Sequence, residues 1–330
     1  MSIDFAARSH DRLLSSLVEA FRAYGAILGM VAVFIVIALI KPSFGHVANI
    51  ENVLRQCTVL LMMSLGLTLV LAMRGVDLCV AQTVDAAAIM SAGLLVHGAP
   101  TWLAFTAPLV LGVVIGLLNG LLTAYLGIPA IIATLGMMFV VRSGELIYTH
   151  GSDPQILFTL PDSTTQVFFF LGRHTIAGVP ALIVLALIVF FAVYALATRT
   201  AFGRQARAVG FNVRAAYLAG IDTRRVFAAG FVVSGVCAAI AGVAMVSRTG
   251  IAMPRGAEPL LLDAFTAVYL GTLASRGGAM TIPGTLVGTL FVSFLSNGLT
   301  MLGLGAPFRF TLNGLFILLA MAVGALRRPH

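Results

Sequence analysis

The chain has 330 residues, of which 60% are hydrophobic and only 10% charged, and its mean hydropathy is +1.05. A soluble globular protein averages about 25% charged residues, so this composition excludes a soluble domain and makes lipid the solvent for most of the chain. The net charge is +8, but the basic residues gather at the ends of apolar stretches, so we interpret them as determinants of membrane topology and expect no nucleic-acid partner.

Ten apolar stretches follow one another along the chain, and each predicts a helix because backbone groups in hydrocarbon must be hydrogen-bonded within their own segment. Most have about the 20 residues that a span needs. The stretch Leu78–Val96 contains Gln82 and Asp85, and Leu260–Ala274 is short and contains Asp263, so both are expected to be partial or broken elements. The prediction is an all-α polytopic membrane protein with about ten transmembrane helices, of which eight are full spans. The stretches are Tyr24–Ile40, Val53–Ala72, Leu78–Val96, Trp102–Leu126, Ile128–Tyr148, Ile176–Ala197, Val226–Val246, Leu260–Ala274, Thr281–Leu302 and Phe308–Leu326.

The distribution of basic residues predicts the orientation of these spans. Ten crossings that start inside leave the larger basic set on the cytoplasmic side, as the positive-inside rule requires. Both termini, including residues 1–23, are then cytoplasmic, and residues 149–175 form a long external loop. The inner set is Arg8, Arg12, Arg22, Arg74, Arg199, Arg204, Arg207, Arg214, Arg224, Arg225, Arg276, Arg327 and Arg328, and the outer set is Lys41, Arg55, Arg173, Arg248, Arg255 and Arg309.

Residues 198–225 interrupt the apolar pattern with a basic, polar segment between two membrane-length stretches. Its centre predicts one short helix, Val213–Ala219, with Asn212 as N-cap and Gly220 as the glycine that ends it. A short, well-delimited helix on a cytoplasmic loop is typical of a docking element, and a plain surface loop anchored by its arginines is the alternative.

Four ordered segments, from about residue 50 to the end, resemble the membrane permease subunits of bacterial ABC importers of the ribose type. The loop above resembles the coupling-loop pattern G-x-N-x-x-A-A-x-x-x-G-I of that family. The other segments are GVDLCVA, similar to the family's GIDLSVG, and two longer ones that begin at Ile128 and Leu260. The loop residues that meet the pattern are Gly210, Asn212, Ala215, Ala216, Gly220 and Ile221.

The resemblance implies a single permease domain over residues 1–330 and a set of partners. These are a second permease copy, a cytoplasmic ABC ATPase and a periplasmic sugar-binding protein, in the bacterial inner membrane. The cargo would be a monosaccharide or related polyol. The helix Val213–Ala219 would insert into the ATPase, with Arg214, Tyr217 and Leu218 among its contacts and with Ala215 and Ala216 allowing close approach.

The chain itself is not expected to be an enzyme. A phosphate-binding loop needs G-x-x-x-x-G-K-[ST], and the one lysine, Lys41, is followed by Pro42, so if transport is driven by ATP we expect the nucleotide site on another chain. The three cysteines, Cys57, Cys79 and Cys237, lie in or beside apolar stretches and predict neither disulfides nor a metal site. No cofactor is expected.

Placing a polar or ionisable side chain within a span costs free energy, so such residues are functional candidates. We expect Arg142 and Glu145 to pair on one helix, and Asp85 and Asp263 each to face a wet cavity or a helix N-terminus. The candidates for a translocation pathway are Asp77, Asp85, Asn119, Asp263, Asn297 and Asn313. For the asparagines, a hydrogen bond to a neighbouring helix is the structural alternative, and for Asp77 it is a pair with Arg74.

Two further expectations remain open. Gly112, Gly116 and Gly120 lie on one helix face and predict close helix packing within the bundle.

The alternative functions are an ABC permease for branched-chain amino acids or nucleosides and an ion-coupled secondary transporter. A membrane enzyme is not favoured, because the sequence contains no HExxH or GxSxG motif.

Overall fold

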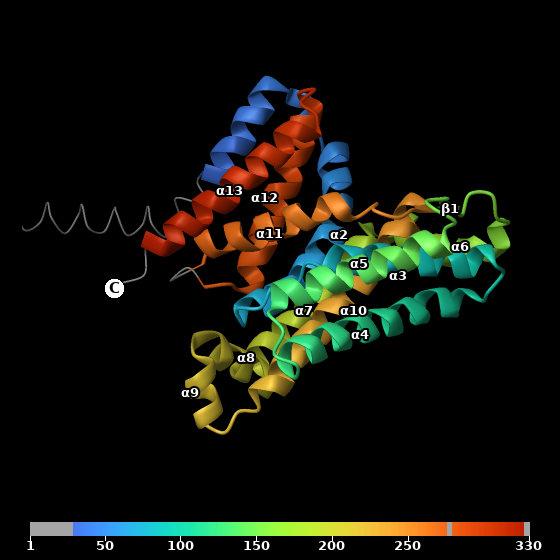
Figure 1. Ribbon diagram of the computed structural model, residues 1–330. Helices are drawn as coiled ribbons and strands as arrows, with labels where there is room; N and C mark the ends of the chain where they lie inside the picture. The colour runs from blue at the N-terminus through green and yellow to red at the C-terminus, as the bar shows by residue number, and fades with distance from the viewer. Residues whose placement is uncertain (1–28, 276–278, 327–330) are drawn as a thin grey trace, which may run out of the picture.

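The computed structural model describes residues 29–275 and 279–326 (Figure 1), and most of them lie in helices. The predicted cytoplasmic segment 1–23 and the residues Arg276, Arg327 and Arg328 lie outside the described residues. A helix in the described residues matches each of the ten predicted stretches. These helices are Gly29–Ile40, α2 (Val47–Ala72), α3 (Val80–Val96), α4 (Thr101–Ala124), α5 (Ala130–Tyr148), α7 (Ala181–Arg199), α10 (Thr223–Thr249), α11 (Glu258–Leu273), α12 (Ile282–Met301) and α13 (Ala306–Leu326).

Six of these helices, α2, α4, α5, α7, α10 and α12, are long and apolar enough to cross a membrane. Helix α3 has 17 residues and α11 has 16, which agrees with the expectation that these two are partial elements. The all-helical, polytopic architecture is therefore present in the described residues, and the total of ten crossings stays a prediction.

The predicted external loop of residues 149–175 is not a plain loop. It contains β1 (Gln155–Ile156), which pairs antiparallel with β4 (Ile251–Ala252), and the amphipathic helix α6 (Asp162–Arg173). Phe168 and Phe169 of α6 are buried in a cluster with Leu95 and Val246. Sequence analysis missed α6 because it is shorter than a span and its apolar residues cover one face.

Two other connections also differ from the expectation. The strands β2 (Thr175–Ile176) and β3 (Val179–Pro180) form a hairpin, so α7 begins at Ala181 rather than at Ile176. The short 3-10 helix η1 (Pro42–Gly45) precedes α2. These short elements lie between the spans and leave the helical core unchanged.

Helix α10 is at the centre of one group of helices, and α2 joins this group to a second one. Figure 1 shows α3, α4, α5 and α10 running side by side, while helix 29–40, α12 and α13 form a separate layer. Helix α2 packs against both α10 and α12, and most of its side chains are buried. The fold is thus two helical layers that share α2.

The predicted glycine ladder lies against α10, which confirms close packing within the bundle. A Cβ atom on Gly116 would collide with the Phe231 carbonyl oxygen, and one on Gly112 with the Gly235 carbonyl oxygen. A Cβ atom on Gly120 would come within 2.8 Å of the Ala228 Cα atom. The two backbones therefore approach closely because side chains are missing at these positions.

We predict that Gly116→Leu lowers the free energy of unfolding by about 1–3 kcal/mol or more, because the added side chain overpacks the α4–α10 contact. The measurement is loss of helical circular dichroism during titration of the detergent-purified chain with a denaturing detergent. Gly136→Leu is the matched control, since a Cβ atom at Gly136 on α5 meets nothing within 4 Å. Equal losses in both variants would contradict the packing role of Gly116.

Candidate functional site

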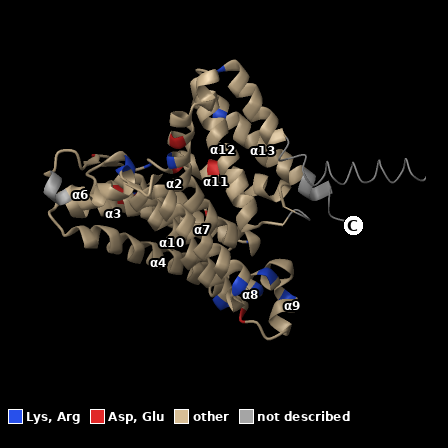
Figure 2. Ribbon diagram, turned by 180° about the vertical axis from the view of Figure 1, so that it is seen from behind, with Lys and Arg blue, Asp and Glu red and all other residues tan. Residues whose placement is uncertain are grey.

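The segment after α7 forms two helices rather than one, and both lie beyond the ends of the long helices (Figure 1). They are α8 (Ala201–Phe211) and α9 (Val213–Leu218). Sequence analysis predicted α9 and missed α8. Thr200 is the signal that could have found α8, because its hydroxyl oxygen accepts a hydrogen bond from the Gly203 amide as an N-cap. Figure 2 shows arginines gathered on this pair of helices.

The predicted caps of α9 are confirmed. The Asn212 Oδ1 atom accepts a hydrogen bond of 3.0 Å from the Ala215 amide. At the other end, Gly220 has a φ of +81° and its amide donates to the Tyr217 carbonyl oxygen, while the Ile221 amide donates to the Ala216 carbonyl oxygen. This is the Schellman pattern, in which a glycine in the left-handed region ends the helix. Local sequence therefore fixes where α9 begins and ends.

One face of α9 is buried against the rest of the chain, and the opposite face is exposed. Ala216 is only 4% exposed and packs with Met73, Ala206 and Val226. This corrects the expectation that Ala216 allows close approach of a partner, because its methyl group is already covered by this chain. Arg214 and Ala215 are exposed as expected.

The exposed face of this segment is apolar. Tyr217 is 68% exposed, Leu218 78% and Phe211 81%, and Val213 is also exposed. We define Phe211, Val213, Tyr217 and Leu218 as the α9 surface. Phe211 and Val213 were not among the predicted contact residues, and their positions on either side of the Asn212 cap are what bring them onto this surface.

Helix α8 rests directly on the end of α2. A Cβ atom on Gly210 would collide with the Ala72 carbonyl oxygen, so only glycine lets α8 lie this close. The Arg74 Nη2 atom donates to the Phe211 carbonyl oxygen at 3.2 Å. Ile221 is half-buried in the same cluster as Ala216. Of the predicted loop residues, Gly210, Ala216 and Ile221 hold the segment in place, and the rest face outward.

A hollow of about 1130 Å³ lies beside α9. It is lined by Tyr125 from the α4–α5 connection, by Tyr217 and Leu218, and by the polar turn that leads into α10. Asp222 caps α10 through the Arg225 amide at 3.1 Å and pairs with the Arg225 guanidinium. The hollow and the α9 surface together present apolar side chains next to a basic edge.

Asp77 lies at the start of α3 and is buried. Its carboxylate accepts hydrogen bonds from the Ser234 hydroxyl at 2.8 Å and from the Cys79 amide at 3.1 Å. Arg74 bonds elsewhere, so the expected Arg74–Asp77 pair is wrong. Asn119 is buried nearby on α4, and its Oδ1 atom has no hydrogen-bond partner among the described residues. The side chain does hydrogen-bond Cys79 at the start of α3, so the interhelical hydrogen bond expected of Asn119 is confirmed.

Asp85 meets a helix N-terminus, as one of its two expected settings required. Its Oδ1 atom accepts a bond of 2.7 Å from the Ala257 amide, directly before α11. Its Oδ2 atom, the Gln82 Nε2 atom and both Glu145 carboxylate oxygens are buried without partners in the described part of the chain. The expected pairing of Glu145 with Arg142 is wrong, since no ion pair joins them there. We call Gln82, Asp85 and Glu145 the α3–α5 polar row.

The remaining candidates lie between other helices. Asp263 on α11 pairs with Arg309 and accepts a hydrogen bond of 2.6 Å from the Asn313 side-chain amide, both on α13, so it meets side chains rather than the helix N-terminus or wet cavity expected for it. Asn297 accepts a bond of 2.9 Å from the Asn49 amide of α2. The structural alternative for Asn297 and Asn313 is thus confirmed. Of the six pathway candidates, Asp77, Asp85 and Asn119 thus lie at or beside α3, whereas Asp263, Asn297 and Asn313 make contacts between other helices.

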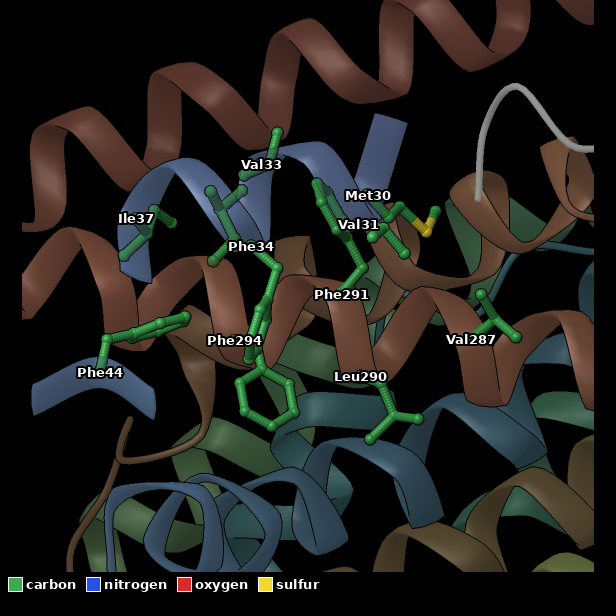
Figure 3. A pocket seen from close by; sticks show the side chains of 11 residues that line it. Met30, Val31, Val33, Phe34, Ile37, Phe44, Val287, Leu290, Phe291 and Phe294 are labelled. Atoms are coloured by element: carbon green, nitrogen blue, oxygen red, sulfur yellow. The ribbon is translucent and has the colours of Figure 1, made fainter. Parts of the chain in front are cut away.

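Two cavities follow α12. One, of about 290 Å³, lies between helix 29–40 and α12 and is lined by apolar side chains, including Phe34, Phe291 and Phe294 (Figure 3). The other, of about 510 Å³, lies between the ends of α2 and α7, α8 and the start of α12, and it includes hydroxyl groups and Arg207. Among the described residues, the side chains that line the first cavity offer no hydrogen-bonding group to a polar solute.

Comparisons with known proteins decide the family. Residues 49–326 match the family described as "Branched-chain amino acid transport system / permease component". The chain belongs to this permease family. It is 32% identical over 298 residues to the ribose import permease protein RbsC of Escherichia coli (strain K12), with 90% of this chain and 92% of that protein covered.

Two further relatives agree in length and kind. The permease is 34% identical over 297 residues to the ribose import permease protein RbsC of Bacillus subtilis (strain 168), covering 90% of this chain and 91% of the relative. It is 30% identical over 304 residues to the L-arabinose ABC transporter permease protein AraH of Azospirillum brasilense, covering 92% and 88%. No solved structure matches the chain. The protein is a multi-pass membrane permease.

We predict that the Asp263–Arg309 pair of the permease behaves as a buried ion pair. Arg309→Met should lower the free energy of unfolding by about 3 kcal/mol, because it leaves a buried carboxylate uncompensated. The double variant Asp263→Leu with Arg309→Met should recover most of that loss. Denaturing-detergent titration of the purified variants measures both values.

The exposed Glu51–Arg55 pair serves as the control for this cycle. The Glu51 side chain is 46% exposed, so Glu51→Gln should cost less than about 1 kcal/mol. A double variant at 263 and 309 that is as unstable as the sum of its two single variants would show that the pair has no coupling energy.

Proposed function

We propose that this chain is the membrane-spanning subunit of an ATP-driven importer for a monosaccharide or related polyol delivered by a periplasmic binding protein. The relatives reported above, matched over about nine-tenths of this chain, are named for ribose and L-arabinose import, which supports a carbohydrate cargo. The family description names branched-chain amino acids instead. Full-length similarity to sugar permeases favours the carbohydrate, and the amino acid is the second candidate.

The single observation that supports coupling to another chain is the α9 surface. Four apolar side chains, three on α9 and one at the end of α8, are exposed beyond the ends of the spans, and the other face of α9 is packed against the protein. An exposed aromatic anchor surrounded by polar groups is a typical centre of a protein interface. We propose that this surface enters a groove of a cytoplasmic ABC ATPase, as an amphipathic helix enters an apolar groove.

The proposed arrangement has a second permease copy and a cytoplasmic location for the α8–α9 pair and both termini. The arginines on α8 and α9 support this orientation through the positive-inside rule. The sequence has no P-loop, so the ATPase is a separate chain. Closure of two ATPase subunits would move α9, and because α8 rests on α2, it would move the spans with it.

The α3–α5 polar row supports a path for a hydroxylated solute through this chain. Buried polar atoms without partners cost about 1–3 kcal/mol each, and the hydroxyl groups of a sugar or water molecules would satisfy them in passing. A few such groups bind weakly, which suits a path that must release its cargo. Asp85 belongs to this row, whereas Asp263, Asn297 and Asn313 serve helix packing.

We predict that cells that depend on this chain for uptake accumulate labelled ribose or L-arabinose and lose that uptake when the chain is deleted. Uptake should be restored by the intact gene and should stop when cellular ATP is depleted. Labelled leucine is the comparison solute, and it tests the second candidate function. Deletion that abolishes leucine uptake and leaves both pentoses unaffected would reject the carbohydrate proposal.

We further predict that Tyr217→Ala combined with Leu218→Ala reduces ATP-dependent uptake at least tenfold. Loss of a central interface anchor typically costs about 2 kcal/mol or more, which weakens binding by about thirtyfold. The permease should still insert and fold, because both side chains are exposed. Uptake and co-purification of the ATPase with the tagged permease are the two measurements.

The matched control removes two exposed apolar side chains within a span, as Ile188→Ala with Phe191→Ala on α7. This variant should transport normally. Ala216→Arg would not test docking alone. Ala216 is buried within this chain, so an arginine there would also disrupt the packing of α9 against α8 and α10. If the variant with both Tyr217→Ala and Leu218→Ala kept normal uptake and normal ATPase binding, the proposed docking role of the α9 surface would be contradicted.

A further inference from the structure

The two cavities along α12 differ in chemistry and share a wall. Val287 lines both of them. Toward the start of α12, the larger cavity is lined by Thr281, Ile282, Pro283 and Gly284. Beyond Val287, the smaller one is lined by α12 side chains that end at Leu295 and by helix 29–40 (Figure 3). The two cavities therefore follow one another along the same helix, polar at one end and apolar at the other.

Polar groups line the larger cavity from the α7–α8 connection and from the residues between α11 and α12. Thr198, Ser275 and Thr281 contribute hydroxyl groups, and Arg207 contributes a guanidinium. Leu69, Tyr194, Met280 and Val287 are among its apolar walls. A ligand that fills both cavities must therefore have a polar part in the larger one and an apolar part in the smaller one.

Arg207 is a cation without an acidic partner in the described part of the chain. None of the ion pairs found there includes it, and its one hydrogen bond goes from Nη1 to the Ala197 carbonyl oxygen at 2.6 Å. Arg207 is the arginine that lines the cavity, and α7 and α8 contain no acidic residue. The mouth of the cavity is thus positively charged and complementary to an anion.

The length of the combined track matches one lipid leaflet. From Thr281 to Phe294 the helix rises by about 20 Å, at 1.5 Å per residue, and half of a bilayer of about 40–45 Å, headgroup regions included, is about 20–22 Å. The smaller cavity is lined by apolar side chains only. An acyl chain is compatible with this apolar lining, whereas the hydroxyl groups of a sugar would have no hydrogen-bond partner there.

We propose that the two cavities form one binding site for an anionic phospholipid of the cytoplasmic leaflet. The headgroup phosphate lies at Arg207 and the neighbouring hydroxyls, and an acyl chain follows α12 past Val287 toward Phe291 and Phe294. Basic pockets between spans on the cytoplasmic side are known to suit anionic headgroups. The choice of leaflet rests on the orientation given under the proposed function, whereas the chemistry of the site does not.

The test measures lipid retention by the purified full-length permease in detergent, without any ATPase. Phosphatidylglycerol and phosphatidylcholine with the same acyl chains are the probes, and native mass spectrometry counts the lipid that remains bound. Arg207→Gln should lower retention of phosphatidylglycerol about fivefold, since one basic residue near the surface contributes about 1 kcal/mol. Arg207→Lys should keep most of it, which separates charge from the bond to Ala197.

Arg204→Gln is the matched control, because Arg204 is exposed on the same helix and does not line the cavity. It should leave retention unchanged. Val287→Trp should block the track and lower retention of both lipids, whereas Leu319→Trp on the exposed face of α13 should not. Circular dichroism checks that each variant keeps its helices.

Three results would overturn the proposal. Equal losses in Arg207→Gln and Arg204→Gln would mean that only the overall surface charge attracts the lipid. Displacement of the lipid by glycerol phosphate would mean that the site binds a free anion. Full retention in Val287→Trp would mean that no acyl chain lies along α12. Failure of the transport experiments would leave this measurement intact, because it requires neither cargo nor ATPase.

Discussion

The close approach of α10 to both α2 and α4 is the contact on which the rest of the permease depends. Ser234 and Gly235 of α10 lie between Gly66 of α2 and Gly112 of α4, where a Cβ atom on Gly66 would come within 2.7 Å of the Ser234 Cα atom. In hydrocarbon, helices gain little from burying apolar surface, so close van der Waals packing must hold them together. Glycines at these contacts let the backbones meet. The Ser234 hydroxyl points elsewhere and donates a hydrogen bond to Asp77.

This packing also positions the α8–α9 pair. Helix α2 ends against Gly210 of α8, and Val226 at the start of α10 packs on Ala216 of α9. Helices α2 and α10 therefore support the α8–α9 pair on the side opposite to the exposed α9 surface. A force on α9 reaches the core through backbone contact rather than through a flexible loop, which is the mechanical basis of the proposed coupling.

The polar side chains within the helical layers divide into those that hold helices together and those that keep polar atoms without a partner. Asp77, Asp263, Asn297 and Asn313 have partners on other helices, whereas Asp85, Gln82 and Glu145 keep polar atoms without any in the described residues. Sequence marked most of these residues as unusual for a membrane interior. It could not separate the two groups, because the partners come from helices far away along the chain.

The sequence by itself determined the helical membrane architecture, the places of the apolar helices and the caps of α9, because hydropathy, glycine and Asn212 act over a few neighbouring residues. Tertiary structure decided which face of α9 is free, since Ala216 is covered by α8 and α10 and Tyr217 is not. It also decided that Glu145 does not meet Arg142 and that Asp85 meets the start of α11. Those outcomes depend on the rotation and depth of each helix against its neighbours, which no local pattern fixes.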